Sequence, residues 1–106
     1  MHNFLARQVK DDISESVDLE RFSSKNFFMR EDGTANLSNF KSSVPILKSL
    51  GMSLKGRVRL QDFDDRRGYF YDIASILNNL AKHYPYIGWA EMRIYGQPYI
   101  GFFVKE

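Results

Sequence analysis

Two alternating runs of apolar residues, at residues 89–95 and 99–105, constrain the fold of this chain more than any other feature. Each run places an apolar side chain at every second position, and a short segment with Gly96 and Pro98 separates them. A period of two is typical of β-strands that bury one face. We therefore predict an antiparallel hairpin with a three-residue loop, Gly96-Gln97-Pro98.

The register of this hairpin follows from keeping the apolar residues together. Ile94 then lies opposite Ile100, and Met92 lies opposite Phe102, on a buried face. Because a shift of one residue moves every side chain of a strand to the other face, the loop length is part of this prediction. The other face is predicted to carry Trp89, Glu91, Arg93, Tyr95, Tyr99, Gly101, Phe103 and Lys105.

A third strand is predicted at residues 52–60, where apolar and polar residues also alternate. Val58 lies on its apolar side, whereas Lys55, Arg57 and Arg59 lie on its polar side. If this strand joins the hairpin, its cations share the outward face with the aromatic residues listed above.

Helical spacing of apolar residues predicts a main amphipathic helix over residues 66–84, which Pro85 ends. Shorter helices are expected at residues 3–15 and around residues 43–50. The Asp32-Gly33 pair favours a two-residue turn, and it predicts a further hairpin within residues 26–37 that places Phe28 opposite Leu37.

These elements predict an α+β fold in a single domain spanning residues 1–106, with a mainly antiparallel sheet, a C-terminal hairpin and the main helix packed on one face. A chain of 106 residues with 43% hydrophobic residues is long enough to bury one core. The predicted core consists of Val58, Leu60, Phe70, Ile73, Leu77, Leu80, Met92, Ile94, Ile100 and Phe102.

The composition excludes several classes of site and favours one compartment. The chain has no cysteine, so disulfides, zinc–thiolate sites and cysteine nucleophiles are absent. It shows neither a signal-peptide pattern nor an apolar run of about 18 residues. We therefore expect a cytoplasmic protein without a membrane partner. A net charge of +2 does not by itself demand a nucleic-acid partner.

Carboxylates and histidines offer few candidates for catalysis or metal binding. Asp62, Asp64 and Asp65 carry the oxygen ligands that Mg²⁺ prefers, but their position suits a strand-to-helix loop with a helix cap. His2 and His83 are far apart in the sequence, and a metal set needs more ligands. We predict no metal site, no cofactor and no catalytic residue.

The outward face of the predicted sheet is the candidate binding site. Cations between aromatic rings are typical of single-strand RNA platforms, while Trp, Tyr and Arg are typical of protein-interface hot spots. The candidate partner-binding residues are Lys55, Arg57, Arg59, Trp89, Arg93, Tyr95, Tyr99, Phe103 and Lys105.

Three functions remain open at this point. The first is a small non-catalytic binding protein with a protein partner, such as an inhibitor, an immunity protein or a phage-type regulator. The second is an RNA- or single-strand-binding domain that uses the aromatic and basic face. The third is a small metal-independent ribonuclease on that face. The modest charge favours the first, because nucleic-acid binding draws much of its affinity from basic residues.

Overall fold

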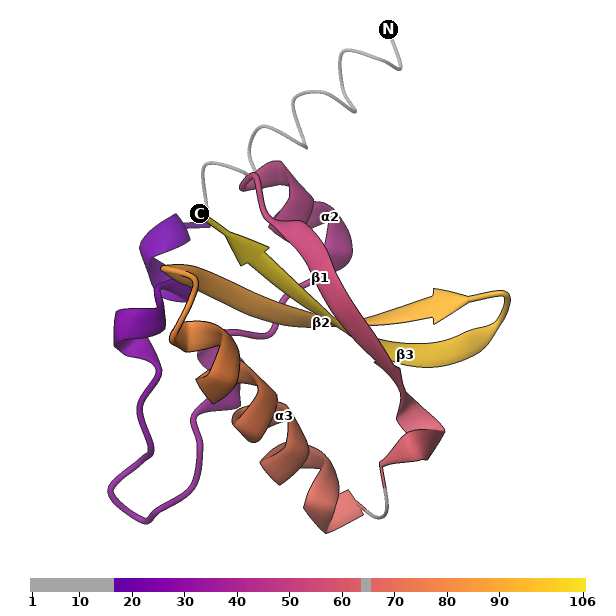
Figure 1. The fold of residues 1–106 in the computed structure, drawn as a ribbon, viewed down its shortest axis with the longest axis horizontal. Coiled ribbons are helices and arrows are strands. Elements are labelled where there is room, and N and C mark those ends of the chain that lie inside the picture. Colours follow the sequence, from indigo (N-terminus) through magenta and orange to yellow (C-terminus); the bar gives the residue numbers. More distant parts are fainter. Residues whose placement is uncertain (1–16, 64–65) are drawn as a thin grey trace, which may run out of the picture.

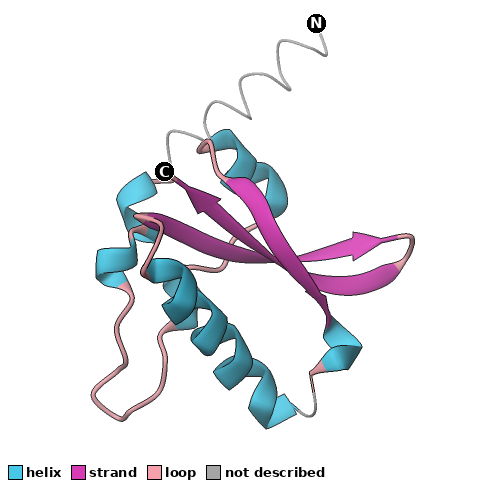
Figure 2. Ribbon diagram, viewed as in Figure 1, coloured by secondary structure: helices cyan, strands magenta, loops and turns pink. Residues whose placement is uncertain are grey.

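A three-stranded antiparallel sheet forms the centre of the molecule (Figure 1). The computed structural model describes residues 17–63 and 66–106. The strands are β1 (Ser53–Arg59), β2 (Tyr86–Ile94) and β3 (Gln97–Lys105). Their order is β1-β3-β2, so that β3 is central and pairs with both neighbours. Helices and loops surround this sheet (Figure 2), and the α+β prediction is confirmed.

The main helix, α3 (Arg66–Ala81), packs against one face of the sheet. It ends three residues before the predicted boundary at residue 84, because Lys82 and His83 already form a turn. The amide of His83 donates to the carbonyl of Leu80 at 3.0 Å in this turn. The predicted helix at residues 3–15 and the predicted cap at residues 64–65 lie outside the described residues.

The first core cluster joins α3 to the sheet. Ile73, Leu77, Ile100 and Phe102 are buried in it as predicted, with Val58 and Leu80 partly buried at its margin. Phe70 was predicted to be in this core, but it is 55% exposed. Tyr69, one residue earlier and therefore about 100° around the helix, packs against the cluster in its place.

A second core cluster lies on the opposite face of the sheet. It contains Phe22, Leu47, Met52, Ala90 and Phe103. Phe22 comes from a 3-10 turn, Leu19–Phe22, and Leu47 comes from the short helix α2, Val44–Ser49. Gly51 follows the end of α2 with a φ of 84°, which glycine adopts without strain.

The hairpin turn is shorter than the sequence predicts, and this reverses the facing of β2. Ile94 pairs with Gln97, so the loop is the two-residue turn Tyr95-Gly96. Both residues have positive φ, at 51° and 79°, as in the type I′ turn whose twist matches the strands. Trp89 consequently pairs with Phe102 and lies in the first core cluster. The predicted core positions of Met92 and Ile94 are wrong: both are half-buried on the other face.

Strand β1 also departs from simple alternation. Its register against β3 shifts between Leu54 and Gly56, which leaves Lys55 unpaired in a β-bulge. Leu54 and Val58 therefore face opposite sides of the sheet, although the sequence places them on one side. Leu60 was predicted to be buried, but it lies in the 3-10 turn Leu60–Asp62 beyond the end of the strand, where it is exposed.

The hairpin predicted at residues 26–37 is reduced to a single bridge, between Met29 and Ala35. The amide of Arg30 donates to the carbonyl of Thr34 at 2.6 Å, so the loop between them spans three residues, 31–33, rather than two. The predicted pairing of Phe28 with Leu37 is wrong, since Leu37 is buried and Phe28 is 63% exposed.

The two outer edges of the sheet differ. The edge of β2 is covered where Ser23 pairs with Tyr86 and where Lys41 pairs with Trp89. Trp89 also donates its amide to the carbonyl of Phe40 at 2.7 Å. The edge of β1, by contrast, pairs with no strand in residues 17–63 and 66–106.

Candidate partner-binding surface

The structure divides the predicted binding residues between the core and the surface. Trp89 and Phe103 were expected to face outward, but both are buried, and they lie in different core clusters on opposite faces of the sheet. The two-residue turn accounts for Trp89, since it exchanges the facing of every side chain of β2 relative to β3. Phe103 is buried because Phe22 and Leu47 cover its face of the sheet. The predicted aromatic and basic residues therefore do not lie together on one exposed face of the sheet.

Tyr95 is the predicted residue that the structure exposes most. It lies at the tip of the hairpin, which extends beyond β1 and stands clear of the helices (Figure 1). Its side chain is fully exposed. The backbone of Tyr95 has a φ of 51°. Among the described residues, Tyr95 is the one non-glycine residue with a positive φ.

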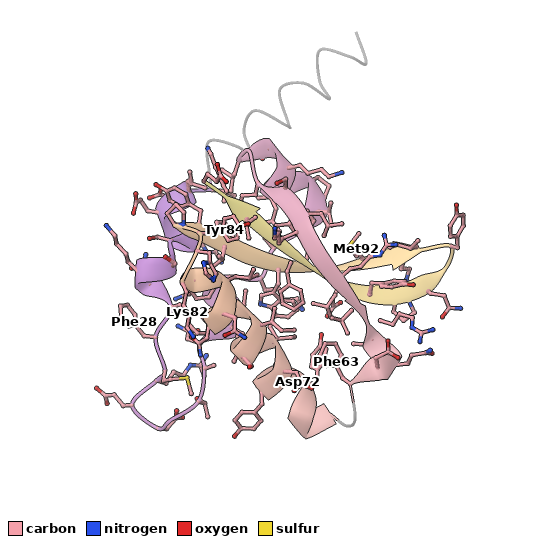
Figure 3. The ribbon with its side chains drawn as sticks, in the orientation of Figure 1. Phe28, Phe63, Asp72, Lys82, Tyr84 and Met92 are labelled. Atoms are coloured by element: carbon pink, nitrogen blue, oxygen red, sulfur yellow. The ribbon has the colours of Figure 1, made fainter. Side chains whose placement is uncertain are left out.

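Part of the face that carries the second core cluster is not covered by helices. Gly101 is at its centre, and a Cβ there would lie 2.5 Å from Sδ of Met92 and 3.2 Å from Cδ1 of Leu54. These side chains therefore meet over a position that only glycine leaves free. Tyr99 and Ile94, both half-buried, extend the same area toward the tip (Figure 3 marks Met92).

Two arginines of β1 border this area. The guanidinium carbon of Arg57 lies 5.6 Å from the ring centre of Tyr99, within the range of a cation–π contact. Arg59 donates to the Asp62 carboxylate through Nε at 3.1 Å and Nη2 at 3.2 Å. The hydrogen bonds to Asp62 hold the pKa of Arg59 above its usual value.

We call this area the open surface. It comprises Leu54, Arg57, Arg59, Met92, Ile94 and Tyr99, with Tyr95 at the tip of the hairpin. Beside it, a hollow of about 370 Å³ runs along the hairpin and is lined by Leu60, Glu91, Met92, Arg93, Pro98 and Tyr99. Four of the predicted binding residues thus come together here: Arg57, Arg59, Tyr95 and Tyr99.

The other predicted cations lie elsewhere. Arg93 is exposed on the face that carries α3, and its Nη1 donates to the carbonyl of Gly96 at 3.2 Å. Lys105 is half-buried, and its Nζ donates to the carbonyl of Leu50 at 3.2 Å. The bulged Lys55 reaches toward Tyr84 (labelled in Figure 3), with 5.6 Å between Nζ and the ring centre.

A second concave region was not anticipated from the sequence. It has a volume of about 640 Å³ and lies between α3 and the loop around residue 33, lined by Arg30, Asp32, Thr34, Ala35, Leu37, Ser38, Phe70 and Tyr71. Asp32 accepts hydrogen bonds from the hydroxyl of Thr34 at 2.6 Å and from its amide at 2.9 Å. These bonds hold the pKa of Asp32 below its usual value.

The described carboxylates and histidine form no metal centre. Asp62 is bound to Arg59, while the two aspartates at residues 64–65 lie outside the described residues. His83 is exposed in the turn after α3. Across residues 17–63 and 66–106, no three His, Cys, Asp or Glu side chains come close enough together to hold a metal ion.

None of the helices in the described part of the chain combines the length and the apolarity needed to traverse a lipid bilayer. Comparisons of the sequence with protein-family models and with curated proteins, and of the structure with solved structures, find no match.

Proposed function

We propose that this protein is a small non-catalytic binding protein of the inhibitor, immunity-protein or phage-regulator type, and that it binds a protein partner through the open surface and Tyr95. The cytoplasm is the compartment in which we expect this interaction. The proposal is carried by one observation, the conformation and exposure of Tyr95.

Tyr95 combines two unfavourable properties. A bulky residue at a φ of 51° is strained by about 1–3 kcal/mol, whereas Asn or Gly would fit the same turn. Its ring is also fully exposed, so burial in the monomer does not offset the strain. Strained residues that folding does not require are typical of binding sites, where contact with a partner offsets the strain.

The residues beside Tyr95 are of the kinds that dominate protein interfaces. Tyr and Arg are enriched among hot spots, and Tyr99 and Arg57 already contact each other in the free protein. Met92 adds a flexible apolar side chain that adapts to the shape of a partner. The open surface is thus preorganised in its charged part and adaptable in its apolar part.

Single-stranded nucleic acid is the second candidate, because Arg57 stacked on Tyr99 also suits a base and its phosphate. The support for it is weaker, since Trp89 and Phe103 lie in the core and are not available for stacking. A ribonuclease would need the same face, and no described residue adds support for it.

The test is affinity capture from an extract of the native host, with and without nuclease. The bait proteins are the wild type, Tyr95→Asn, and a control, Tyr71→Ala, which removes an exposed tyrosine from α3 instead of the hairpin. We expect a protein that survives nuclease treatment, is retained by Tyr71→Ala and is lost with Tyr95→Asn. The affinity loss should reach about 2 kcal/mol, or roughly thirtyfold.

Equal capture by Tyr95→Asn and the wild type would refute the proposal. Recovery of RNA fragments in place of a protein, with capture abolished by nuclease, would establish the second candidate instead. Binding to the purified partner would then be measured against salt, because phosphate contacts make affinity fall steeply as salt rises.

A further inference from the structure

The outer edge of β1 differs from the outer edge of β2. Two other segments of the chain cover β2, through the pairs Ser23–Tyr86 and Lys41–Trp89. β1 pairs only with β3 within the described residues, and six of its seven residues are exposed. An uncovered edge presents a row of backbone donors and acceptors that another extended chain can bind.

The regular part of β1 defines the length of this edge. After the bulge at Lys55, the register against β3 runs without interruption from Gly56, opposite Phe102, to Arg59, opposite Tyr99. A partner strand therefore has about four consecutive positions to pair with. Arg57 and Arg59 point to the same face, which is the face of the open surface.

The charges on β1 select the kind of chain that fits. The strand carries Lys55, Arg57 and Arg59 and contains no acidic residue. A second copy paired antiparallel about Arg57 would place Lys55 opposite Arg59, and like charges directly opposite each other are destabilising. Self-pairing in this register is therefore disfavoured, whereas carboxylates are attracted to the cations of β1.

We propose that β1 accepts an extended acidic segment of the protein partner as a fourth strand of the sheet. This inference rests on the function proposed above and states how the partner binds. Backbone hydrogen bonds hold the segment, and carboxylates at alternate positions face Arg57 and Arg59. RNA is disfavoured at this edge because its backbone offers no row of amide donors and carbonyls.

The probe is a synthetic heptapeptide that alternates glutamate and valine, titrated into the ¹⁵N-labelled full-length protein. We expect the amide signals of β1 to shift and the amides to become protected from hydrogen exchange. Two control peptides separate the contributions. One replaces each glutamate with lysine, and the other keeps the glutamates but carries N-methyl groups at alternate residues. Each control should bind at least about tenfold more weakly.

Variants of the protein test the same charges from the other side. Arg57→Glu with Arg59→Glu should invert the preference, so that the lysine peptide binds more tightly than the glutamate peptide. Lys25→Glu with Lys48→Glu, a control that reverses two exposed charges away from β1, should keep the wild-type order. Circular dichroism of both variants confirms that they are folded.

Three results would overturn the inference: signals that shift away from β1, equal binding of the N-methylated peptide, or tighter binding of an oligouridylate to β1 than of the glutamate peptide. The proposed function is tested separately, by the capture experiment with Tyr95→Asn. If the peptide does not bind to β1 but Tyr95→Asn still fails to capture the protein partner, only the strand-addition mode of binding is refuted.

Discussion

Gly88 lies where β2 packs closely against the elements on the second face of the sheet. A Cβ at this position would lie 3.0 Å from Cδ2 of Leu47 and 3.3 Å from both Cδ1 of Phe22 and the carbonyl oxygen of Phe40. The neighbours include backbone and buried rings, which cannot move aside without disturbing the second core cluster. A methyl group at residue 88 therefore requires these neighbours to shift by a few tenths of an ångström.

We predict that Gly88→Ala lowers the free energy of unfolding by about 1–3 kcal/mol through overpacking. Gly56→Ala is the matched control, because no atom lies within 4 Å of its Cβ position. The control should change stability by less than about 0.5 kcal/mol. Chemical denaturation measures both variants, and equal midpoints would contradict the packing at Gly88.

Ionisation of Tyr69 makes the free energy of unfolding depend on pH in the alkaline range. Burial beside the first core cluster raises the pKa of its phenol, and the negative charge of Glu91 raises it further. The folded state therefore holds this proton more tightly than the unfolded chain does. The corresponding stability is complete below the unfolded pKa of about 10 and is lost as the pH rises through the folded pKa.

We predict that Tyr69→Phe loses less stability than the wild type between about pH 9 and pH 11. The measurement is the free energy of unfolding by urea at several pH values, with the two proteins compared at each. Parallel curves across this range would show that Tyr69 does not contribute to the alkaline loss.

In the β2–β3 hairpin, the residue with the least favourable backbone conformation lies at the exposed tip. Tyr95 occupies a turn position that favours Asn, Asp or Gly. We predict that Tyr95→Asn raises the free energy of unfolding by about 1 kcal/mol, because Asn adopts positive φ at lower cost. Thermal and urea denaturation measure the gain. A loss of stability would mean that the tyrosine ring supports the monomer.

Substitutions on α3 can test which side of the helix packs against the sheet. Leu77 is fully buried, whereas Phe70 is mostly exposed. We predict that Leu77→Ala costs about 2–5 kcal/mol, and that Phe70→Ala costs well under half as much although it removes a larger side chain. Similar losses in chemical denaturation would show that the helix is rotated from its described position.

The alternation of apolar and polar residues identified the strands of the sheet, but it did not give the lengths of the loops. Both loop lengths were predicted wrongly, and in opposite directions. The 95–96 turn is shorter than predicted because Tyr95 tolerates positive φ, which its residue type does not suggest. The loop at residues 31–33 is longer because Gly33, with a φ of 85°, is a third loop residue after Glu31 and Asp32, before Thr34 pairs with Arg30.

The error in the 95–96 turn bears on where the candidate binding residues lie in the fold. Arg57, Arg59, Tyr95 and Tyr99 were expected at the surface and lie there or at its margin. Trp89 was misplaced because the charged Glu91 and Arg93, which share its face of β2, favoured a prediction that this face points outward. Phe103 has an apolar neighbour on each side, and the pattern did not show that both faces of β3 are covered.

At the scale of the whole molecule, we expect the cations of β1 to keep its uncovered edge from pairing with a second copy. We predict that Lys55→Thr, Arg57→Thr and Arg59→Thr together cause self-association, because threonine favours strands and removes the repulsion. Sedimentation velocity at several concentrations measures the effect relative to the wild type.

The control for this prediction removes the same charge elsewhere, through Lys25→Thr, Lys48→Thr and Lys82→Thr, all exposed positions outside the sheet. The control should sediment like the wild type. If both triple variants associate equally, net charge rather than the edge keeps the molecules apart.

The strand order β1-β3-β2 also has a consequence for the time at which the sheet forms during synthesis. β1 and β2 pair with β3 and not with each other, and both leave the ribosome before it does. At about 5–20 residues per second, β1 waits several seconds for the strand that will hold it. Until then neither strand has its sheet partner, so nascent chains that stop before Gln97 should be captured by chaperones, and release should coincide with the appearance of β3.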